Sequence, residues 1–434
     1  MNTATKIERA NKLPEKGASH ADIKQTIQTI KSAYQDPRNS FSDRWLNDCG
    51  LLIDDGVVEV AKETYLAFFT KNNSFPPVLE MEHELVSIAL DLFHAGPNAV
   101  GNLTSGGSES LFLATAAAIR KARKSRPDVQ QPEILLASSG YPTFEKYAPY
   151  LNYKIRRVPI DKDFRADPYE LANAISHETV MMLASVSSWS HGAVDPVPEL
   201  AKIAQENDVW LHVDACVGGF LAPFVRDLGR VLPDFDFSVP GVSSISADFH
   251  KYGYAAKGVS GIFFRDQSAG RDQAFVYDAW PAGLYRSPSF TGTRSGGAIA
   301  AAWAVMRYLG KEGYLARAAQ ILKTRDAIVA QIEADEKLHL IGRAELGTVA
   351  FGSSGTDIYR IAANLKSKGW AFNLLKEPAG IQLVLGPLAD AYIERLVAEM
   401  GDAIKTATPD DEFSAPAVVY SDEILARPGS LLSE

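Results

Sequence analysis

Short runs of apolar and β-branched residues alternate with helical segments through the middle of the 434-residue chain. Helical patterns at residues 111–126, 167–175 and 198–207 separate several of these runs. Six runs have the length and composition of buried strands: residues 134–137, 154–158, 180–186, 209–213, 243–246 and 261–264. This alternation is typical of an α/β fold in which helices cover both faces of a mostly parallel sheet.

The pattern changes on either side of this region. The first residues are polar and charged, and a helical pattern follows at 57–70. An alanine-rich helix predicted at 298–309 leads into a stretch that indicates a smaller α+β unit. We therefore expect an N-terminal arm with helices, a large domain and a small C-terminal domain, at residues 1–95, 96–310 and 311–434.

Composition narrows the class of protein. Hydrophobic residues make up 46% of the chain and charged residues 22%, which is ordinary for a globular protein. The net charge of −9 supplies no basic face, so we expect no nucleic-acid partner. The two cysteines, Cys49 and Cys216, indicate a reducing compartment rather than a disulfide framework. No apolar stretch approaches membrane-spanning length, so we predict a cytoplasmic protein without a membrane span.

Three features, in chain order, indicate a site for pyridoxal 5′-phosphate (PLP). The first is the turn Thr-Ser-Gly-Gly-Ser-Glu-Ser at residues 104–110. Gly106 and Gly107 allow backbone N–H groups at a helix N-terminus to approach an anion, and Ser108 adds a hydroxyl donor. Taken alone, the turn could equally be a helix cap with Ser105 or Ser108 as the N-cap residue. It lacks the lysine of a Walker A loop, which argues against a nucleoside triphosphate.

The other two features are a carboxylate and a lysine. Asp214 ends an apolar strand, where it could keep a pyridine nitrogen protonated or form a structural ion pair. Lys251 follows His250 at the end of a short β-like run. Burial and neighbours could lower the pKa of its amine, which would then attack the cofactor aldehyde. Lys257 competes for that role but is better placed to meet an anionic substrate, and His250 could contact the phosphate or cap the strand.

Several longer motifs resemble the group II PLP-dependent decarboxylase family and, within it, the sphingosine-1-phosphate lyases. They lie at residues 104–110, 191–196, 212–220, 239–254 and 287–297, and the similarity runs in order from about residue 75 to residue 385. The resemblance implies a fold-type I homodimer, with a large PLP-binding domain of aspartate aminotransferase type. It also implies that the active sites lie at the subunit interface and use residues of both subunits.

The resemblance assigns roles to individual positions. Lys251 matches the lysine that bonds to the cofactor. Asp214 matches the carboxylate that pairs with the ring nitrogen. Phosphate contacts fall on Gly106, Gly107, Ser108 and His250, and Gly292 and Thr293 would reach the phosphate bound by the partner subunit. Tyr141 stands where the family has a histidine stacked on the ring. An aromatic ring can still stack there, but its part in proton transfer changes.

The segment that would bind the substrate differs from that of the lyases. Before the Phe-Pro pair the lyases have a histidine that helps to bind the substrate's phosphate, and residues 68–74 contain no histidine. Either Lys71 or Asn72 replaces it, or the substrate carries no phosphate. Further candidates for substrate contact are His191, Lys257, Tyr285 and Arg360, and Tyr254 is a candidate proton donor beside Lys251.

We therefore predict a PLP-dependent carbon–carbon lyase. It would cleave a β-hydroxy amine, phosphorylated or not, by retro-aldol chemistry into an aldehyde and a smaller amine. The altered segment 68–74 favours a smaller and more polar amine than sphingosine 1-phosphate. The alternative is an amino-acid decarboxylase that releases CO₂ and binds the α-carboxylate through Arg360 or Arg294. A binding protein without catalysis would not need Lys251 and Asp214 in these positions.

Overall fold

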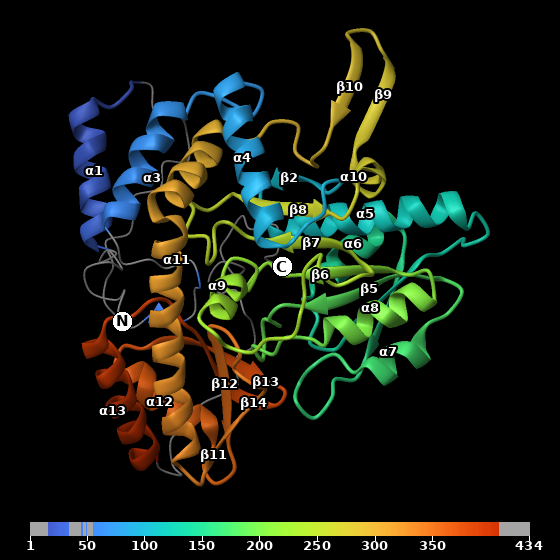
Figure 1. The fold of residues 1–434 in the computed structure, drawn as a ribbon. Coiled ribbons are helices and arrows are strands. Elements are labelled where there is room, and N and C mark those ends of the chain that lie inside the picture. Colours follow the sequence, from blue (N-terminus) through green and yellow to red (C-terminus); the bar gives the residue numbers. More distant parts are fainter. Residues whose placement is uncertain (1–15, 34–44, 47–48, 50–54, 408–434) are drawn as a thin grey trace.

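The computed structural model describes residues 16–33, 45–46, 49 and 55–407 (Figure 1). Its largest sheet has the strand order β2-β8-β7-β6-β5-β3-β4. These strands are β2 (Val100–Thr104), β3 (Glu133–Ala137), β4 (Lys154–Val158), β5 (Thr179–Ser185), β6 (Trp210–Asp214), β7 (Val242–Ala247) and β8 (Ser260–Phe264). Strands β4, β3, β5, β6 and β7 pair in parallel, whereas β8 pairs antiparallel with both β7 and β2. The expected α/β fold with a mostly parallel sheet is confirmed.

Helices shield both faces of this sheet, so the central strands are buried and mostly apolar. Every residue of β3, β5, β6 and β8 is buried. The covering helices include α5 (Gly107–Ser125), α6 (Thr143–Leu151), α7 (Pro168–Ala174), α8 (Val197–Glu206), α9 (Ala222–Asp227) and α10 (Gln267–Gln273). Strand β2 was not expected from the sequence.

A second sheet has the order β1-β13-β14-β12-β11. Its strands are β1 (Trp45–Leu46), β13 (Ala371–Lys376), β14 (Ala379–Val384), β12 (Thr348–Ser353) and β11 (Leu338–Leu340), accompanied by α12 (Ile358–Ser367) and α13 (Asp390–Thr406). Strand β1 pairs in parallel with β13, so a piece of the N-terminal part joins the C-terminal sheet. The last residues of the expected C-terminal unit, from 408 onward, lie outside the described residues.

The helix expected at 298–309 is much longer. Helix α11 (Gly296–Glu333) extends beside both sheets and packs against α3 (Asp55–Phe68) and α4 (Pro76–Leu92) (Figure 1). It is interrupted at Gly310, whose φ of 54° and ψ of −177° are not helical. Near the N-terminus lies α1 (His20–Ala33). Within the described residues, no helix has both the length and the apolar character needed to cross a membrane.

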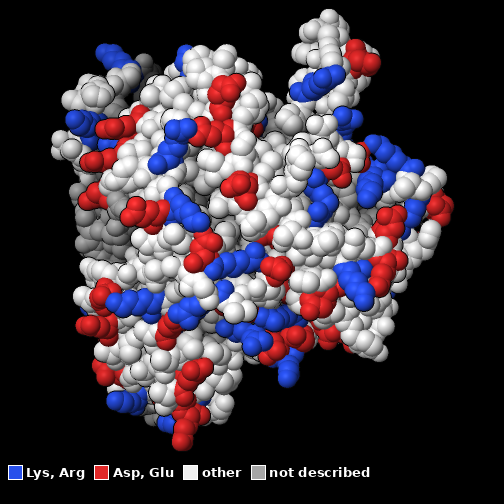
Figure 2. Space-filling model, viewed as in Figure 1, with Lys and Arg blue, Asp and Glu red and all other residues white. Residues whose placement is uncertain are grey.

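A two-stranded hairpin projects from the molecule (Figure 1). It consists of β9 (Phe275–Trp280) and β10 (Gly283–Ser287), paired antiparallel. Large apolar side chains are exposed along it: Phe275, Val276, Tyr277, Trp280, Leu284 and Tyr285. In Figure 2 the hairpin is mostly uncharged, whereas acidic and basic side chains intermingle over the rest of this face. A projecting surface of this kind is typical of a protein–protein contact.

Candidate active site

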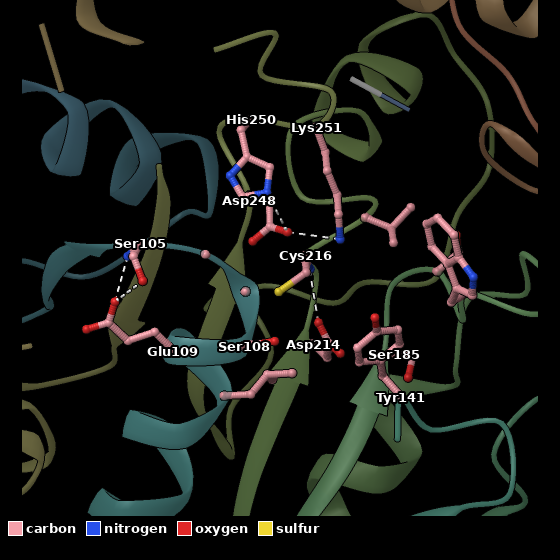
Figure 3. Close-up of a pocket in the computed structure, with 16 residues that line it drawn as sticks. Ser105, Ser108, Glu109, Tyr141, Ser185, Asp214, Cys216, Asp248, His250 and Lys251 are labelled. Atoms are coloured by element: carbon pink, nitrogen blue, oxygen red, sulfur yellow. Dashed lines mark hydrogen bonds and ion pairs between the residues drawn. The ribbon is translucent and has the colours of Figure 1, made fainter. Parts of the chain in front are cut away.

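A cavity of about 410 Å³ lies at the carboxyl ends of the parallel strands, where α5 begins (Figure 3). Strand ends and helix N-termini meet at this edge, which is where open α/β sheets bind ligands. Seven of the expected site residues line it together: Gly106, Gly107, Ser108, Tyr141, Asp214, His250 and Lys251. The lining also includes residues for which the sequence suggested no role, among them Ser185, Trp189, Cys216 and Asp248.

Asp214 is the last residue of β6, and only 8% of it is exposed. Its Oδ1 accepts hydrogen bonds from the Cys216 amide at 3.1 Å and the Ser246 hydroxyl at 3.4 Å. Burial raises the pKa of this carboxyl above its usual value, while Cys216 and the charge of Lys251 act in the opposite sense. Among the described residues no Lys or Arg forms a salt bridge with Asp214, so the structure does not support the alternative of a structural ion pair.

Lys251 extends toward the same cavity, and its Nζ lies 2.9 Å from Oδ2 of Asp248 (Figure 3). Burial alone would lower the pKa of this amine, but the Asp248 carboxylate outweighs burial and raises it above the usual value. The sequence suggests a lowered pKa for this lysine, whereas the pKa in this structure is raised. The reason is Asp248, a buried carboxylate three residues before the lysine that was not recognised as its partner.

The glycine turn leaves room for a ligand. A Cβ at Gly107 would lie 2.8 Å from Cys216 Sγ and 2.9 Å from Asp248 Oδ1, so a side chain does not fit there. A Cβ at Gly106 would meet only His250 Cε1, at an ordinary contact distance of 3.8 Å, so a small group fits there. His250 Nδ1 is buried and has no hydrogen-bond partner among the described residues. An unpaired imidazole nitrogen in the cavity beside a helix N-terminus suits a phosphate group.

Glu109 ties the turn to another part of the chain. One carboxylate oxygen, Oε2, accepts from both the amide and the hydroxyl of Ser105 at 2.6 Å. The other, Oε1, accepts from the amides of Phe290 at 2.7 Å and Thr291 at 3.2 Å. No side-chain capping bond is made at the start of α5, so neither Ser105 nor Ser108 is its N-cap. Glu109 therefore fixes the position of the turn relative to the loop after the hairpin.

Two aromatic residues belong to the wall of the cavity. Tyr141 and Trp189 line both this cavity and a neighbouring one of about 480 Å³. Lys251 Nζ lies 5.9 Å from the centre of the Trp189 ring. Trp189 was missed because its only sequence signal is its place in the loop after a buried strand.

Three expected residues lie outside the cavity lining. Tyr254 is buried against Tyr314, with ring centres 6.1 Å apart, and burial raises the pKa of its hydroxyl. Lys257 is exposed, and its Nζ donates to the His250 carbonyl at 3.3 Å. His191 is buried against Phe164, and burial lowers its pKa to about 4.

The remaining expected residues also lie outside the lining of this cavity. Lys71 and Asn72 belong to a segment that pairs with the start of α11, through an Asn72–Ser295 bridge and a Gly296 amide that donates to the Lys71 carbonyl at 2.9 Å. Gly292, Thr293, Tyr285 and Arg360 are on the loop after the hairpin, on β10 and on α12. The cavity thus brings together seven of the expected cofactor residues, but not Gly292, Thr293 or the expected substrate residues.

The lining fits PLP. An anion site, a buried carboxylate and an amine surround one space, and a phosphate, a pyridine nitrogen and an aldehyde need these three partners. A sequence model of the pyridoxal-dependent decarboxylase conserved domain matches residues 20–353. The chain belongs to the pyridoxal-dependent decarboxylase family. Its cofactor is therefore PLP, and the protein is an enzyme of the lyase class.

Within this family the similar proteins include sphingosine-1-phosphate lyases. The enzyme of rice is 33% identical over 96% of this chain and 79% of its own length. That of mouse is 40% identical over 72% of this chain, which spans 55% of the mouse protein. The solved structure of the Burkholderia pseudomallei lyase is 34% identical, with a TM-score of 0.87 over 93% of this chain and 94% of the other.

Proposed function

We propose that this enzyme cleaves a β-hydroxy amine by retro-aldol chemistry into an aldehyde and a smaller amine. The observation that carries the proposal is the match to a bacterial sphingosine-1-phosphate lyase over 94% of that chain with a TM-score of 0.87. A cavity that brings Lys251, Asp214 and the turn at residues 104–110 together supports it, because such cleavage needs an electron sink beside the substrate amine. We also propose that a smaller, more polar amine is preferred over sphingosine 1-phosphate.

The roles of the side chains follow from their positions. When bound, PLP supplies the electron sink for the bond that breaks at Cα. Lys251 would hold the cofactor through its amine, and it is the candidate proton donor to Cα because Tyr254 is buried outside the lining. Asp214 would hold the ring nitrogen in its protonated form, and the turn at residues 104–110 would bind the phosphate together with His250. Tyr141, also in the lining, would lie against the ring.

The rival reaction is decarboxylation of an amino acid, for which the family name is the supporting observation. It needs a cation for the α-carboxylate. One candidate, Arg294, is only 9% exposed, and its Nη1 donates to Glu82 Oε1 at 2.6 Å and to the Leu103 carbonyl at 3.1 Å. The other, Arg360, is on α12 outside the cavity lining. We therefore favour carbon–carbon cleavage.

A product assay separates the two reactions. The purified holoenzyme is given sphingosine 1-phosphate, a short phosphorylated hydroxy amine, free β-hydroxy amino acids, and glutamate and tyrosine, and both aldehyde and CO₂ are measured. We expect aldehyde from at least one hydroxy amine and no CO₂. Release of CO₂ without aldehyde would establish the decarboxylase instead. Higher kcat/KM for sphingosine 1-phosphate than for the short amine would overturn the proposed preference.

We further propose a homodimer in which each active site uses both subunits. Gly292 and Thr293 lie outside the lining in one protomer, on the loop after an exposed apolar hairpin, where a second copy can reach them. Subunits carrying Lys251→Ala are mixed with subunits carrying Thr293→Asp, each inactive alone. If sites are shared, each hybrid dimer has one intact site and one site with both substitutions. About half of the dimers in an equal mixture are hybrids, so about a quarter of the wild-type activity should return. Unshared sites would leave the mixture inactive.

We also propose that the enzyme works in the cytoplasm. Its two cysteines are both buried free thiols, which suits a reducing compartment. Cell fractionation with an antibody against the protein tests this, and recovery in the membrane pellet after a salt wash would contradict it.

A further inference from the structure

A chain of hydrogen bonds runs inside the sheet beneath the cavity and ends at Asp214. On β6, residues Trp210, His212 and Asp214 alternate along the strand and point to the same face. On β7, Ser244 pairs with His212 and Ser246 pairs with Asp214. His212 and both serines have no exposed surface at all. Polar groups buried this deeply are stable only when each donor has an acceptor.

That requirement selects one arrangement of protons. Trp210 Nε1–H can only donate, and it lies 2.8 Å from Ser244 Oγ. Ser244 can then direct its own proton to His212 Nδ1, at 2.7 Å. This makes Nδ1 an acceptor and leaves the imidazole proton on Nε2, which donates to Ser246 Oγ at 3.1 Å. Ser246 in turn donates to Asp214 Oδ1 at 3.4 Å.

The other neutral tautomer of His212 does not satisfy the same contacts. With its proton on Nδ1, the hydroxyl proton of Ser244 would have no acceptor among these side chains. Nε2 would then draw the proton of Ser246 away from Asp214. A doubly protonated ring would bury a charge, and burial lowers the pKa of His212 to about 3. Cys216 adds a second donor to Ser246 Oγ at 3.3 Å, so this hydroxyl accepts twice and donates once.

We propose that His212 is a positioning residue, held by Ser244 as the neutral Nε2–H tautomer, through which the buried chain orients Asp214 and favours its carboxylate form. The inference rests on the proposed role of Asp214 toward the ring nitrogen of PLP. Donors that point in one direction along a chain polarise one another, and donors to a carboxylate stabilise its charged form against burial. Because every proton has a fixed direction, the chain sets charge and orientation rather than carrying protons.

The tautomer can be measured without turnover. Solid-state NMR of holoenzyme labelled with ¹⁵N-histidine reports the protonation of each ring nitrogen, and His212→Asn identifies the signal among the eight histidines. We expect His212 to remain neutral with its proton on Nε2 from alkaline to mildly acid pH. In Ser244→Ala the signal should shift toward a mixture of tautomers. A proton on Nδ1 in the wild type, or an imidazolium, overturns the inference whatever reaction the enzyme catalyses.

Kinetics test the effect on Asp214. Ser244→Ala and Ser246→Ala should each reduce kcat about three- to tenfold, the range expected for one hydrogen bond. KM and cofactor affinity should change little, and the absorbance of the bound cofactor should titrate at a shifted pH. The matched control is Ser243→Ala, on the same strand but pointing to the other face, which should resemble the wild type. Cofactor content and thermal unfolding verify that each variant folds. Equal kcat and equal spectra for Ser246→Ala and Ser243→Ala would refute the coupling, whereas an active Asp214→Asn would refute the role of Asp214 itself.

Discussion

The carboxylate of Asp248 lies 2.9 Å from Nζ of Lys251, within one turn of the same loop. Ser260 holds the other carboxylate oxygen at 2.5 Å, so Asp248 is fixed from both sides. It is nearly inaccessible to water, with an exposed fraction of 2%. The amine that is proposed to bond to the cofactor is therefore kept protonated by a neighbour that cannot turn away.

This pair predicts how the enzyme takes up PLP. Only the neutral amine attacks the aldehyde, and Asp248 raises the pKa of Lys251 against the effect of burial. Asp248→Asn removes the largest cause that opposes burial, so the pKa of the amine should fall. The rate of covalent PLP uptake by the apoprotein, followed by absorbance across a pH series, should shift to lower pH. An unchanged pH profile would mean that Asp248 does not control the amine.

Lys251 itself is tested by chemical trapping. Holoenzyme reduced with borohydride and analysed by mass spectrometry should carry the cofactor on Lys251. Lys251→Ala should carry none while its secondary structure is unchanged. The matched control is Lys257→Ala, which removes an exposed lysine six positions later and should trap normally. Trapping in Lys251→Ala but not in Lys257→Ala would reverse the two roles.

Asp214→Asn should retain PLP and lose most turnover. The amide has nearly the shape of the carboxylate but cannot keep the ring nitrogen charged. Removing one preorganised electrostatic partner typically costs about 10²–10³ in kcat. Rapid-mixing kinetics with a substrate from the product assay give kcat, and equilibrium dialysis gives cofactor affinity. Turnover near that of the wild type would make Asp214 a structural residue.

Glu109→Gln should weaken PLP binding without unfolding the protein. The Glu109 carboxylate accepts four hydrogen bonds, two on each oxygen. In the glutamine side chain an NH₂ group, which can only donate, replaces one of these oxygens. At least one hydrogen bond to Ser105 or to the loop at Phe290 is therefore lost. A buried donor left unpaired costs about 1–3 kcal/mol, or roughly a five- to hundredfold loss of affinity. The control is Glu80→Gln, at an exposed position of α4. Equal affinities in the two variants would separate Glu109 from the cofactor.

His191 predicts a pH dependence of stability rather than of catalysis. Its pKa is lowered from 6.5 to about 4 by burial, so the unfolded chain binds the proton more readily. The stability that the neutral ring provides is complete above pH 6.5 and is lost as the pH falls toward 4. The loss attributable to this one group reaches about 3 kcal/mol at the lower limit.

His191→Phe should remove the loss of stability that protonation of His191 causes at acid pH. Denaturant unfolding at neutral and acid pH gives the dependence of the free energy of unfolding on pH, which should be weaker in the variant. Because His191 does not line the cavity, kcat/KM should change by less than about twofold. A large loss of kcat/KM with an unchanged slope would restore His191 as a substrate residue.

The sequence predicted the parallel core of the fold because most of its strands are short apolar or β-branched runs between helical segments. Strand β2 was missed since Val100–Thr104 contains glycine and asparagine and is stabilised by pairing with β8. The hairpin was missed because its exposed strands show no alternation of apolar and polar residues. In both cases the deciding contacts are distant or belong to the surface, and local patterns do not contain them.

In the candidate site, too, the residues with a local sequence signal were predicted and the others were missed. The signals are a glycine turn for Gly107, a strand end for Asp214 and a His-Lys pair for Lys251, and all three residues line one cavity. Asp248 had a signal that could have been read, a carboxylate three residues before the lysine at the end of a buried strand. Trp189 and the expected substrate residues had none, because their positions depend on how loops and, under the proposal, a second subunit come together.

The pairing of β2 with β8 also sets the order in which the enzyme can be completed during synthesis. Thr104 pairs with Ser260, so β2 remains without its neighbour until the ribosome has made β8. Closing so long a loop is slow compared with forming helices and local contacts. The turn at residues 104–110 follows β2 directly, and its Glu109 accepts from the amides of Phe290 and Thr291, which are made later still. These long-range contacts of the turn can therefore form only after most of the chain has been synthesised.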